Sequence, residues 1–162
     1  MLAVDQSGSM AESVIYAAVT AAIFASLDVL KTRLIFFATE IVDMSDLLHD
    51  PVEILFSAQL GGGTDIARAV AYASDQLIER PGRTIFILVS DLFEGGDRND
   101  LLARMRNLVE SKVKAMCLLA LTDRGQPAYD HELARDLVEI GVPCFGATPE
   151  RLVERMEQIL RG

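Results

Sequence analysis

The sequence has little that would place it in or across a membrane. Its longest apolar stretches are interrupted by charged residues well before the roughly 20 consecutive apolar residues that a membrane-spanning helix needs. The first residues, 1–5, lack the basic start and the apolar-then-small order of a secretory signal peptide. We therefore expect a cytoplasmic protein with no membrane span and no export signal.

Cysteine is scarce, and its spacing is not that of a metal motif. The chain has 2 cysteines, Cys117 and Cys144, and each lies in an apolar run without a Cys-x-x-Cys pattern. Buried free thiols are favoured over a disulfide or a metal site, and a reducing cytosol suits such thiols.

The chain also lacks an excess of positive charge. It has 15 Lys and Arg against 24 Asp and Glu, a formal net charge of −9. This balance repels phosphate backbones and anionic lipid surfaces, so we expect neither nucleic acid nor a membrane as a partner. An acidic field instead raises the local concentration of cations, which favours a metal site without demonstrating one.

The composition indicates one globular domain. Hydrophobic residues make up 51% and charged residues 24% of the 162 positions. A chain of this length buries roughly 70% of the surface that its unfolded form exposes, which is enough for one sizeable core. We expect residues 1–162 to form a single domain. Because hydrophobic sequence begins at once, as if inside a strand, the domain could be the carboxyl-terminal part of a longer protein; a natural start at Met1 is the alternative.

Strand-like and helix-like segments alternate along the chain. The predicted strands are 2–4, 33–38, 40–44, 84–90, 113–121 and 142–145. The predicted helices are 12–30, 64–80, 99–111, 130–140 and 149–160, and segment 45–60 is less regular because Pro51 breaks any long helix. This order predicts an α/β, Rossmann-like, doubly wound sheet that is mainly parallel, with helices on both faces. A hairpin around Thr39 and Glu40 adds one antiparallel edge strand.

Oxygen-bearing side chains follow the predicted strands and a glycine run. Asp5, Ser7 and Ser9 come directly after the first strand, Thr64 follows three glycines, and Asp91 ends the apolar strand 84–90. In open α/β sheets, ligands bind outside the carboxyl ends of the strands. The spacing Asp-x-Ser-x-Ser lets alternate side chains of a tight turn point to one side, and we expect Gly8 to permit a close backbone approach. Aspartate and hydroxyl oxygens suit Mg²⁺.

Three separated segments carry a resemblance to a known family. The segments are Asp5-Gln6-Ser7-Gly8-Ser9-Met10, Gly62-Gly63-Thr64-Asp65 and Val89-Ser90-Asp91. In this order, they resemble the metal-ion-dependent adhesion site (MIDAS) of von Willebrand factor A (VWA) domains, over essentially the whole chain. The resemblance implies that Ser7 and Ser9 contact Mg²⁺ or Mn²⁺ directly, that Thr64 does so in some states, and that Asp5 and Asp91 act through water. It also implies that an Asp or Glu of a protein partner completes the metal's coordination.

Within that family, the sequence is similar to the bacterial cytoplasmic CoxE-like and YehP-like proteins. The features that carry this similarity are the DQSGSM opening, the triple glycine before Thr64 and the SDLFEGGD segment that begins at Ser90. The similarity implies a role beside a MoxR-type AAA+ ATPase in assembling or activating protein complexes. The residues from Glu94 to Asp97 replace a shorter turn of many members, and we expect these two acids on the rim of the site, without metal contact.

Simpler structural roles remain for each candidate residue. Asp5, Ser7 and Ser9 could form a helix N-cap cluster, and Thr64 and Asp65 could cap the helix that follows. We favour Thr64 as a ligand and Asp65 as a cap or as a residue that supports a ligand.

An enzyme of the haloacid dehalogenase phosphatase type is the main functional alternative. In those enzymes a strand-end Asp is the nucleophile and a second Asp two residues later is the general acid, but Ser7 occupies that position here. A phosphate-binding Gly-x-x-x-x-Gly-Lys-Ser/Thr loop is absent as well. We therefore expect no enzymatic activity, and a scaffold with a vestigial metal site is the third possibility.

Overall fold

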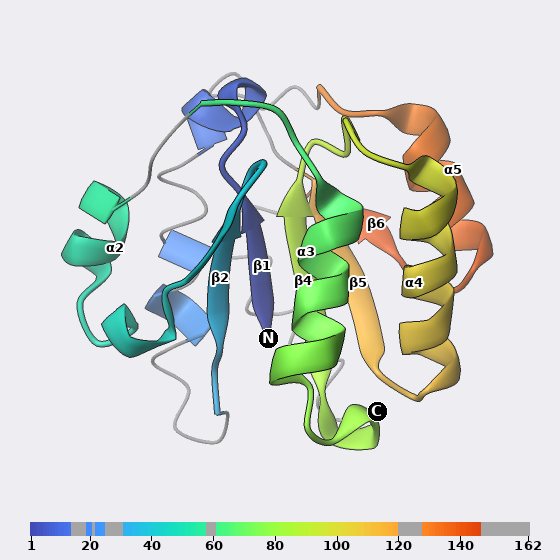
Figure 1. Cartoon of the computed structure of the whole chain (residues 1–162), viewed down its shortest axis with the longest axis horizontal. Helices are drawn as coiled ribbons and strands as arrows, with labels where there is room; N and C mark the ends of the chain where they lie inside the picture. Colours follow the sequence, from blue (N-terminus) through green and yellow to red (C-terminus); the bar gives the residue numbers. More distant parts are fainter. Residues whose placement is uncertain (14–18, 21, 25–30, 58–60, 120–127, 147–162) are drawn as a thin grey trace.

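A six-stranded sheet forms the centre of the molecule in this computed structural model (Figure 1). The structure describes residues 1–13, 19, 20, 22–24, 31–57, 61–119 and 128–146. The strands are β1 (Leu2–Asp5), β2 (Leu34–Phe37), β3 (Ile41–Asp43), β4 (Ile85–Ser90), β5 (Lys114–Leu119) and β6 (Cys144–Phe145), in the spatial order β3-β2-β1-β4-β5-β6. Neighbouring strands are parallel except for β2 and β3, which are antiparallel. The predicted sheet, with its antiparallel edge strand, is confirmed.

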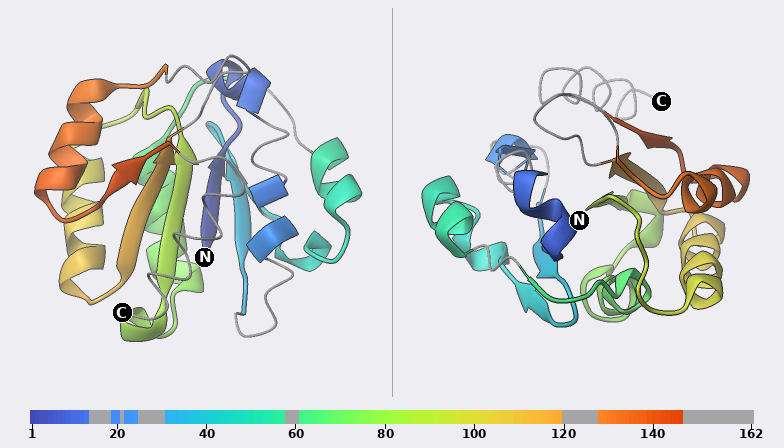
Figure 2. Two further views of the ribbon diagram at one scale, coloured as in Figure 1. Left: turned by 180° about the vertical axis from the view of Figure 1, so that it is seen from behind. Right: turned by 90° about the horizontal axis from the view of Figure 1, so that it is seen from above.

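Helices cover both faces of the sheet, as Figures 1 and 2 show. The α-helices are α2 (Pro51–Ser57), α3 (Ile66–Tyr72), α4 (Arg98–Glu110) and α5 (His131–Glu139). Short 3-10 turns are η1 (Gly8–Ser13), η2 (Ser45–Leu47) and η4 (Pro81–Arg83), and a π-helical segment, η3 (Ala73–Leu77), continues α3.

Strand β4 explains why the sheet must be covered on both sides. Its residues alternate between two apolar cores, with Phe86 and Leu88 in the core beneath α3, α4 and α5 and Ile87 and Val89 in the opposite core. That opposite core contains Ile54 of α2. Since successive side chains of a strand point to opposite faces, a strand that is apolar throughout has to be buried on both of them. No helix within the described ranges is long and apolar enough to cross a bilayer.

One helix differs from its predicted extent, and one short helix was not predicted. The regular part of the helix after the glycine run ends at Tyr72, and π-helical geometry carries it to Leu77. Segment 45–60 contains no long helix across Pro51, as expected, but Pro51 begins the short helix α2, where Asp50 Oδ1 accepts hydrogen bonds from the N–H groups of Val52 (3.1 Å) and Glu53 (3.0 Å). Proline suits a first helical position because the N–H that it lacks would have no helical partner there.

Two of the predicted helices are described only in part or not at all. Of the predicted helix 12–30, the described residues 12 and 13 belong to η1, and residues 19, 20 and 22–24 are helical. The predicted helix 149–160 lies outside the described residues.

The two cysteines are free, as predicted, and are neighbours in the sheet, but only Cys117 is buried as expected. Cys117 of β5 is paired with Cys144 of β6; Cys117 is buried and Cys144 is half-buried. Burial raises the pKa of the Cys117 thiol, and its hydrogen bond to Cys144 raises it further. The same hydrogen bond lowers the pKa of Cys144.

We predict that Cys144 reacts with iodoacetamide before Cys117. The thiolate is the reactive form, and the raised pKa and burial of Cys117 both keep that thiol unreactive. Mass spectrometry of peptides after timed alkylation of the folded protein measures both rates. In a Cys144→Ser control, Cys117 is expected to stay unmodified until the protein is unfolded, and equal rates in the native protein would contradict the prediction.

Candidate functional site

The loop after β1 brings Asp5, Ser7 and Ser9 together. Ser7 N–H donates to Asp5 Oδ1 (2.8 Å), and the Oγ atoms of Ser7 and Ser9 lie 3.2 Å apart. Asp5 and Ser7 are buried, whereas Ser9 is exposed. The predicted tight turn is therefore present. Among the described residues, a Cβ atom at Gly8 would meet nothing within 4 Å, so the contacts within the chain do not require a glycine there.

Strand β4 ends beside β1 and adds Ser90 and Asp91 to the site. Ser90 Oγ donates to Asp5 Oδ2 (2.6 Å) and accepts from Leu92 N–H (2.9 Å). Asp91 is 2% exposed, and its Oδ1 accepts from Phe93 N–H (3.2 Å). Leu92 has a φ of 65°, a left-handed conformation that is rare for a leucine and costs on the order of 1–2 kcal/mol.

Thr64 is fixed to the loop after β4 through its backbone. Its carbonyl accepts from Gly95 N–H (2.9 Å), and a Cβ atom at position 95 would lie 2.6 Å from that carbonyl oxygen. Glycine is therefore required where these two loops touch. Asp65 N–H donates to Ala38 O (3.1 Å), and the Asp65 side chain accepts from Arg68 N–H (2.8 Å), so Asp65 is the N-cap of α3 as predicted.

Glu94 and Asp97 were predicted on the rim of the site, and the structure gives both a helix-capping role. The Glu94 carboxylate accepts from the N–H groups of Ile66 (3.2 Å) and Ala67 (3.0 Å), at the beginning of α3, and from Gly96 N–H (2.7 Å). Asp97 is the N-cap of α4. The loop after β4 thus positions the Thr64 loop. Both Ser90 and Glu94 lie in the sequence motifs that carry the family resemblance. The sequence did not predict that Ser90 would bond to Asp5 or that Glu94 would cap α3.

Two buried carboxylates dominate the electrostatics of the site. Burial raises the pKa of Asp5, the hydrogen bonds from Ser90 and Ser7 oppose that rise, and the negative charge of Asp91 adds to it. Two acids that are almost fully buried and repel each other are stabilised by a cation between or beside them.

The residues present fit a hard divalent cation. The described part of the chain has no cluster of three or more His, Cys, Asp or Glu side chains that could hold a metal ion. The candidate set has two carboxylates, Asp5 and Asp91, and otherwise hydroxyls, from Ser7, Ser9 and Thr64. Oxygen donors of this kind suit Mg²⁺ or Mn²⁺ rather than a soft metal.

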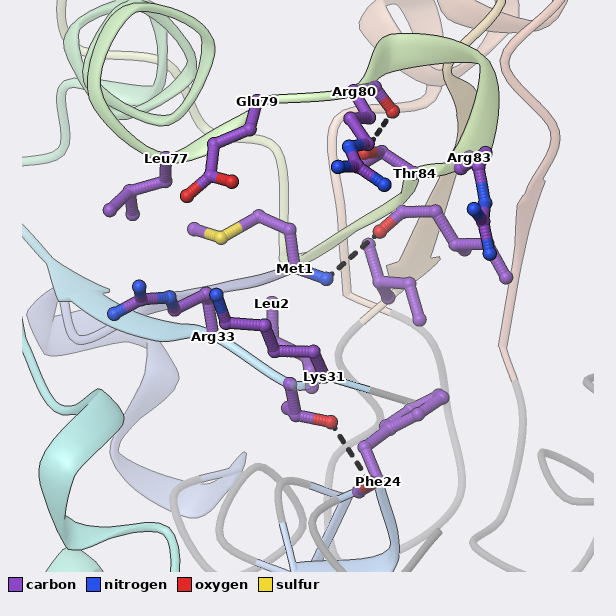
Figure 3. A pocket seen from close by; sticks show the side chains of 13 residues that line it. Met1, Leu2, Phe24, Lys31, Arg33, Leu77, Glu79, Arg80, Arg83 and Thr84 are labelled. Carbon is purple, nitrogen blue, oxygen red and sulfur yellow. Dashed lines mark hydrogen bonds between the residues drawn. The ribbon is translucent and has the colours of Figure 1, made fainter. Parts of the chain in front are cut away.

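A pocket of about 400 Å³ lies at the other end of the sheet (Figure 3). Its lining includes the first residues of β1 and β4 and four cationic side chains, those of Lys31, Arg33, Arg80 and Arg83, against one carboxylate, Glu79. Such a lining disfavours a cation. The acidic carboxyl end of the sheet is therefore the better candidate for a metal site.

Sequence comparisons identify the family of the chain and one curated relative. The profile of a family described as "VWA domain containing CoxE-like protein" matches residues 1–156. The protein YehP of Escherichia coli (strain K12) is 43% identical over 162 residues, which is 100% of this chain and 43% of YehP. The chain thus spans less than half the length of this relative.

Solved structures share the fold at low sequence identity. An aerotolerance-related membrane protein from Bacteroides fragilis has a TM-score of 0.75 at 13% identity, covering 98% of this chain and 96% of its own. Manganese-loaded TRAP protein of Plasmodium vivax has a TM-score of 0.70 at 16% identity, covering 94% and 69%. A von Willebrand factor type A protein from Catenulispora acidiphila has a TM-score of 0.66 at 17% identity, covering 98% and 40%.

We predict that Gly95→Ala destabilises the protein by about 1–3 kcal/mol, because the new Cβ would overlap Thr64 O and force the two site loops apart. Urea unfolding measures the change in the free energy of unfolding. Gly82→Ala is the matched control, since a Cβ there meets nothing within 4 Å. Equal stability of the two variants would show that the contact between the loops does not constrain the site.

Proposed function

The chain belongs to the family of VWA domain containing CoxE-like proteins, and from this premise we propose that it is a divalent-cation-dependent protein-binding module. VWA domains typically mediate protein interactions. In our proposal Asp5, Ser7, Ser9, Thr64 and Asp91 hold one Mg²⁺ or Mn²⁺, and an Asp or Glu side chain of a protein partner completes its coordination. The observation that carries the proposal is the buried Asp5 carboxylate, hydrogen-bonded to Ser7 and Ser90 and close to the second buried acid, Asp91.

The donor set supports a role in binding an acidic partner. Three of the five donors are neutral hydroxyls, and both carboxylates already accept hydrogen bonds from within the protein. A cation held in this way keeps much of its positive charge and attracts an external carboxylate. Phe93, which is 51% exposed and two residues after Asp91, offers apolar surface beside the site.

Catalysis is not part of this proposal. A phosphatase of the haloacid dehalogenase type needs an accessible nucleophilic carboxylate, but Asp5 is 1% exposed and both of its oxygens accept hydrogen bonds. Ser7 stands where the general acid of such an enzyme would be, and a hydroxyl group is a poor proton donor at neutral pH.

Our proposal for the protein's partner and cellular location rests on its similarity to CoxE-like proteins and on its free thiols. The similarity to CoxE-like proteins supports a MoxR-type AAA+ ATPase as the partner, in the assembly or activation of protein complexes. The free thiols of Cys117 and Cys144 support a cytoplasmic location. The manganese in the TRAP protein structure supports testing Mn²⁺ beside Mg²⁺.

We expect calorimetry to detect one saturable site for Mg²⁺ or Mn²⁺, lost in the double variant Ser7→Ala/Ser9→Ala. Ser74→Ala, at an exposed position of η3, is the control and should bind like the wild type. A phosphatase assay on the same samples should detect no turnover. Failure of the wild type to bind either ion would favour a scaffold with a vestigial site, and metal-dependent turnover would favour the hydrolase.

Asp5→Asn should separate stability from metal binding. The amide removes a buried charge but has one acceptor oxygen in place of two, so one of the hydrogen bonds from Ser7 N–H and Ser90 Oγ must be lost or reversed. The metal-free variant should therefore melt below the wild-type temperature. Mg²⁺ at about 100 times its Kd should stabilise the wild type by roughly 2.7 kcal/mol, or about 5–10 °C in Tm. Calorimetric melting checks both values, and a Mg²⁺-induced shift of wild-type size in Asp5→Asn would contradict the role of Asp5.

A further inference from the structure

The register of two neighbouring strands places the two cysteines of the chain next to each other. Cys117 of β5 and Cys144 of β6 are direct partners in this parallel pair, and Cys117 N–H donates to Pro143 O (2.9 Å). Both side chains lie on the same side of the sheet, since Cys117 belongs to the core beneath α3, α4 and α5 and Cys144 packs against that core. Two thiols that are far apart in the sequence are therefore neighbours in the folded chain.

The spacing of these strands permits a disulfide. Neighbouring strands lie about 4.7–4.9 Å apart, and the Cα atoms of a disulfide are usually about 4.4–6.8 Å apart. The Cβ atoms of a relaxed disulfide are closer, at about 3.5–4.5 Å, so bond formation should draw β6 toward β5. Among the described strands β6 is the last of the sheet, and it has two residues, so little structure opposes this shift. A disulfide formed in this way stores strain, and strained disulfides are reduced more readily.

An oxidant in solution reaches Cys144 more readily than Cys117. Cys117 is 0% exposed in a strand with a neighbour on each side, whereas Cys144 is half-buried. The interaction between the thiols lowers the pKa of Cys144, while burial and the same interaction raise the pKa of Cys117. The accessible sulfur is therefore also the one that more readily becomes a thiolate, which is the form that reacts with oxidants.

We propose that Cys144 is a site of oxidation by hydroperoxides and that Cys117 converts the oxidised Cys144 into a reversible disulfide. The Cys144 thiolate attacks one oxygen of hydrogen peroxide, the O–O bond breaks, and the products are a sulfenic acid on Cys144 and, after protonation, water. Cys117 Sγ then attacks the Cys144 sulfur, the S–S bond forms, and the S–O bond breaks. The leaving hydroxide takes the Cys117 proton to give a second water. The two thiols are thus oxidised to one disulfide, and the peroxide is reduced to water.

The disulfide would attach α5 to the centre of the sheet. A short turn joins α5 to β6, and in this turn Val142 N–H donates to Leu137 O (2.9 Å). Because β6 pairs with β5 through two residues, a covalent link between these strands restricts the local opening of β6 and α5. Where glutathione keeps most thiols reduced, a bond of this kind is a transient modification. The inference does not depend on a metal ion at the candidate site.

Peptide mapping of the folded wild-type protein tests the bond directly. After treatment with hydrogen peroxide and alkylation of the remaining thiols in denaturant, trypsin should release peptides 115–124 and 136–151 joined by a disulfide, because it cleaves after Lys and Arg. The intact monomer should lose the mass of two hydrogen atoms. Sulfinic acid on Cys144 beside a free Cys117, or a disulfide between two copies of the chain, would overturn the proposal.

Reversibility is tested on the same oxidised sample. Reduced glutathione attacks the accessible Cys144 sulfur, and a second glutathione releases the mixed disulfide, so both thiols should return without unfolding. A bond that glutathione reduces only in denaturant would contradict a reversible modification.

Two single variants test the order of the steps. In Cys117→Ala the sulfenic acid on Cys144 has no thiol to attack it, so dimedone, which reacts with sulfenic acids, should label Cys144 several-fold more than in the wild type. In Cys144→Ser the same exposure to peroxide should leave Cys117 unlabelled. Urea unfolding establishes first that both variants are folded, and the peptide map of the wild type needs no variant. Equal labelling of the wild type and Cys117→Ala, or labelling of Cys117 in Cys144→Ser, would overturn these roles.

Hydrogen exchange measures whether the disulfide restrains this edge of the sheet. The amides of Cys117 and Val142 should exchange at least about tenfold more slowly in the oxidised protein than in the reduced protein, because the bond limits the opened states. Ala38 N–H, which donates to Glu40 O (2.9 Å) in the hairpin at the opposite edge, should exchange at the same rate in both. Unchanged exchange at Cys117 and Val142 would contradict the attachment of α5.

Discussion

The hydrogen bond between Ser90 Oγ and Asp5 Oδ2 is the contact on which the candidate site depends. It joins the carboxyl ends of β1 and β4, which are 85 positions apart in sequence, and both side chains are buried. With Oδ1 bonded to Ser7 N–H, neither oxygen of Asp5 is free to rotate away. The loop after β1 is therefore fixed relative to the sheet by the Asp5 carboxylate. The same carboxylate orients Ser7 through its N–H, and Ser7 Oγ in turn lies next to Ser9 Oγ.

The other two loops are connected by a different set of contacts. Glu94 caps α3 from the loop after β4, and Gly95 contacts the carbonyl of Thr64. Leu92, with its unfavourable positive φ, lies between Asp91 and the residues Glu94 and Gly95 that make these contacts. The packing of the loop holds Leu92 in this conformation. A strained residue beside paired loops is consistent with a site that is organised before anything binds to it.

The strands of the sheet, the acids at their carboxyl ends and the N-cap of α3 could be predicted from the sequence, because each depends on the order of apolar and polar residues along a short segment. Strand β4 is apolar from Ile85 to Val89, and this run indicated a strand buried on both faces. Asp5 and Asp91 were predicted to lie close together because the carboxyl ends of parallel strands share one edge of the sheet. Asp65 was correctly interpreted as a cap.

The features that the sequence did not predict depend on contacts between side chains and backbone groups that no local pattern reports. Glu94 caps a helix 27 and 28 positions earlier in the chain, and no periodicity reports such a contact. The short helix α2 was not predicted, because the carboxylate of Asp50 that caps it lies just outside the helical segment. Among the described residues, nothing near Gly8 requires a glycine at that position.

Among the described residues, the cationic pocket at the amino ends of the strands and the buried acids at their carboxyl ends form an electric dipole along the sheet. An approaching acidic protein would be turned by this dipole toward the cationic end, over the roughly 8–10 Å that physiological salt allows. In the proposed function, a divalent ion bound among the acids would weaken that torque at the opposite end. Occupancy of the proposed metal site would then affect the direction from which a partner arrives as well as the strength with which it is held.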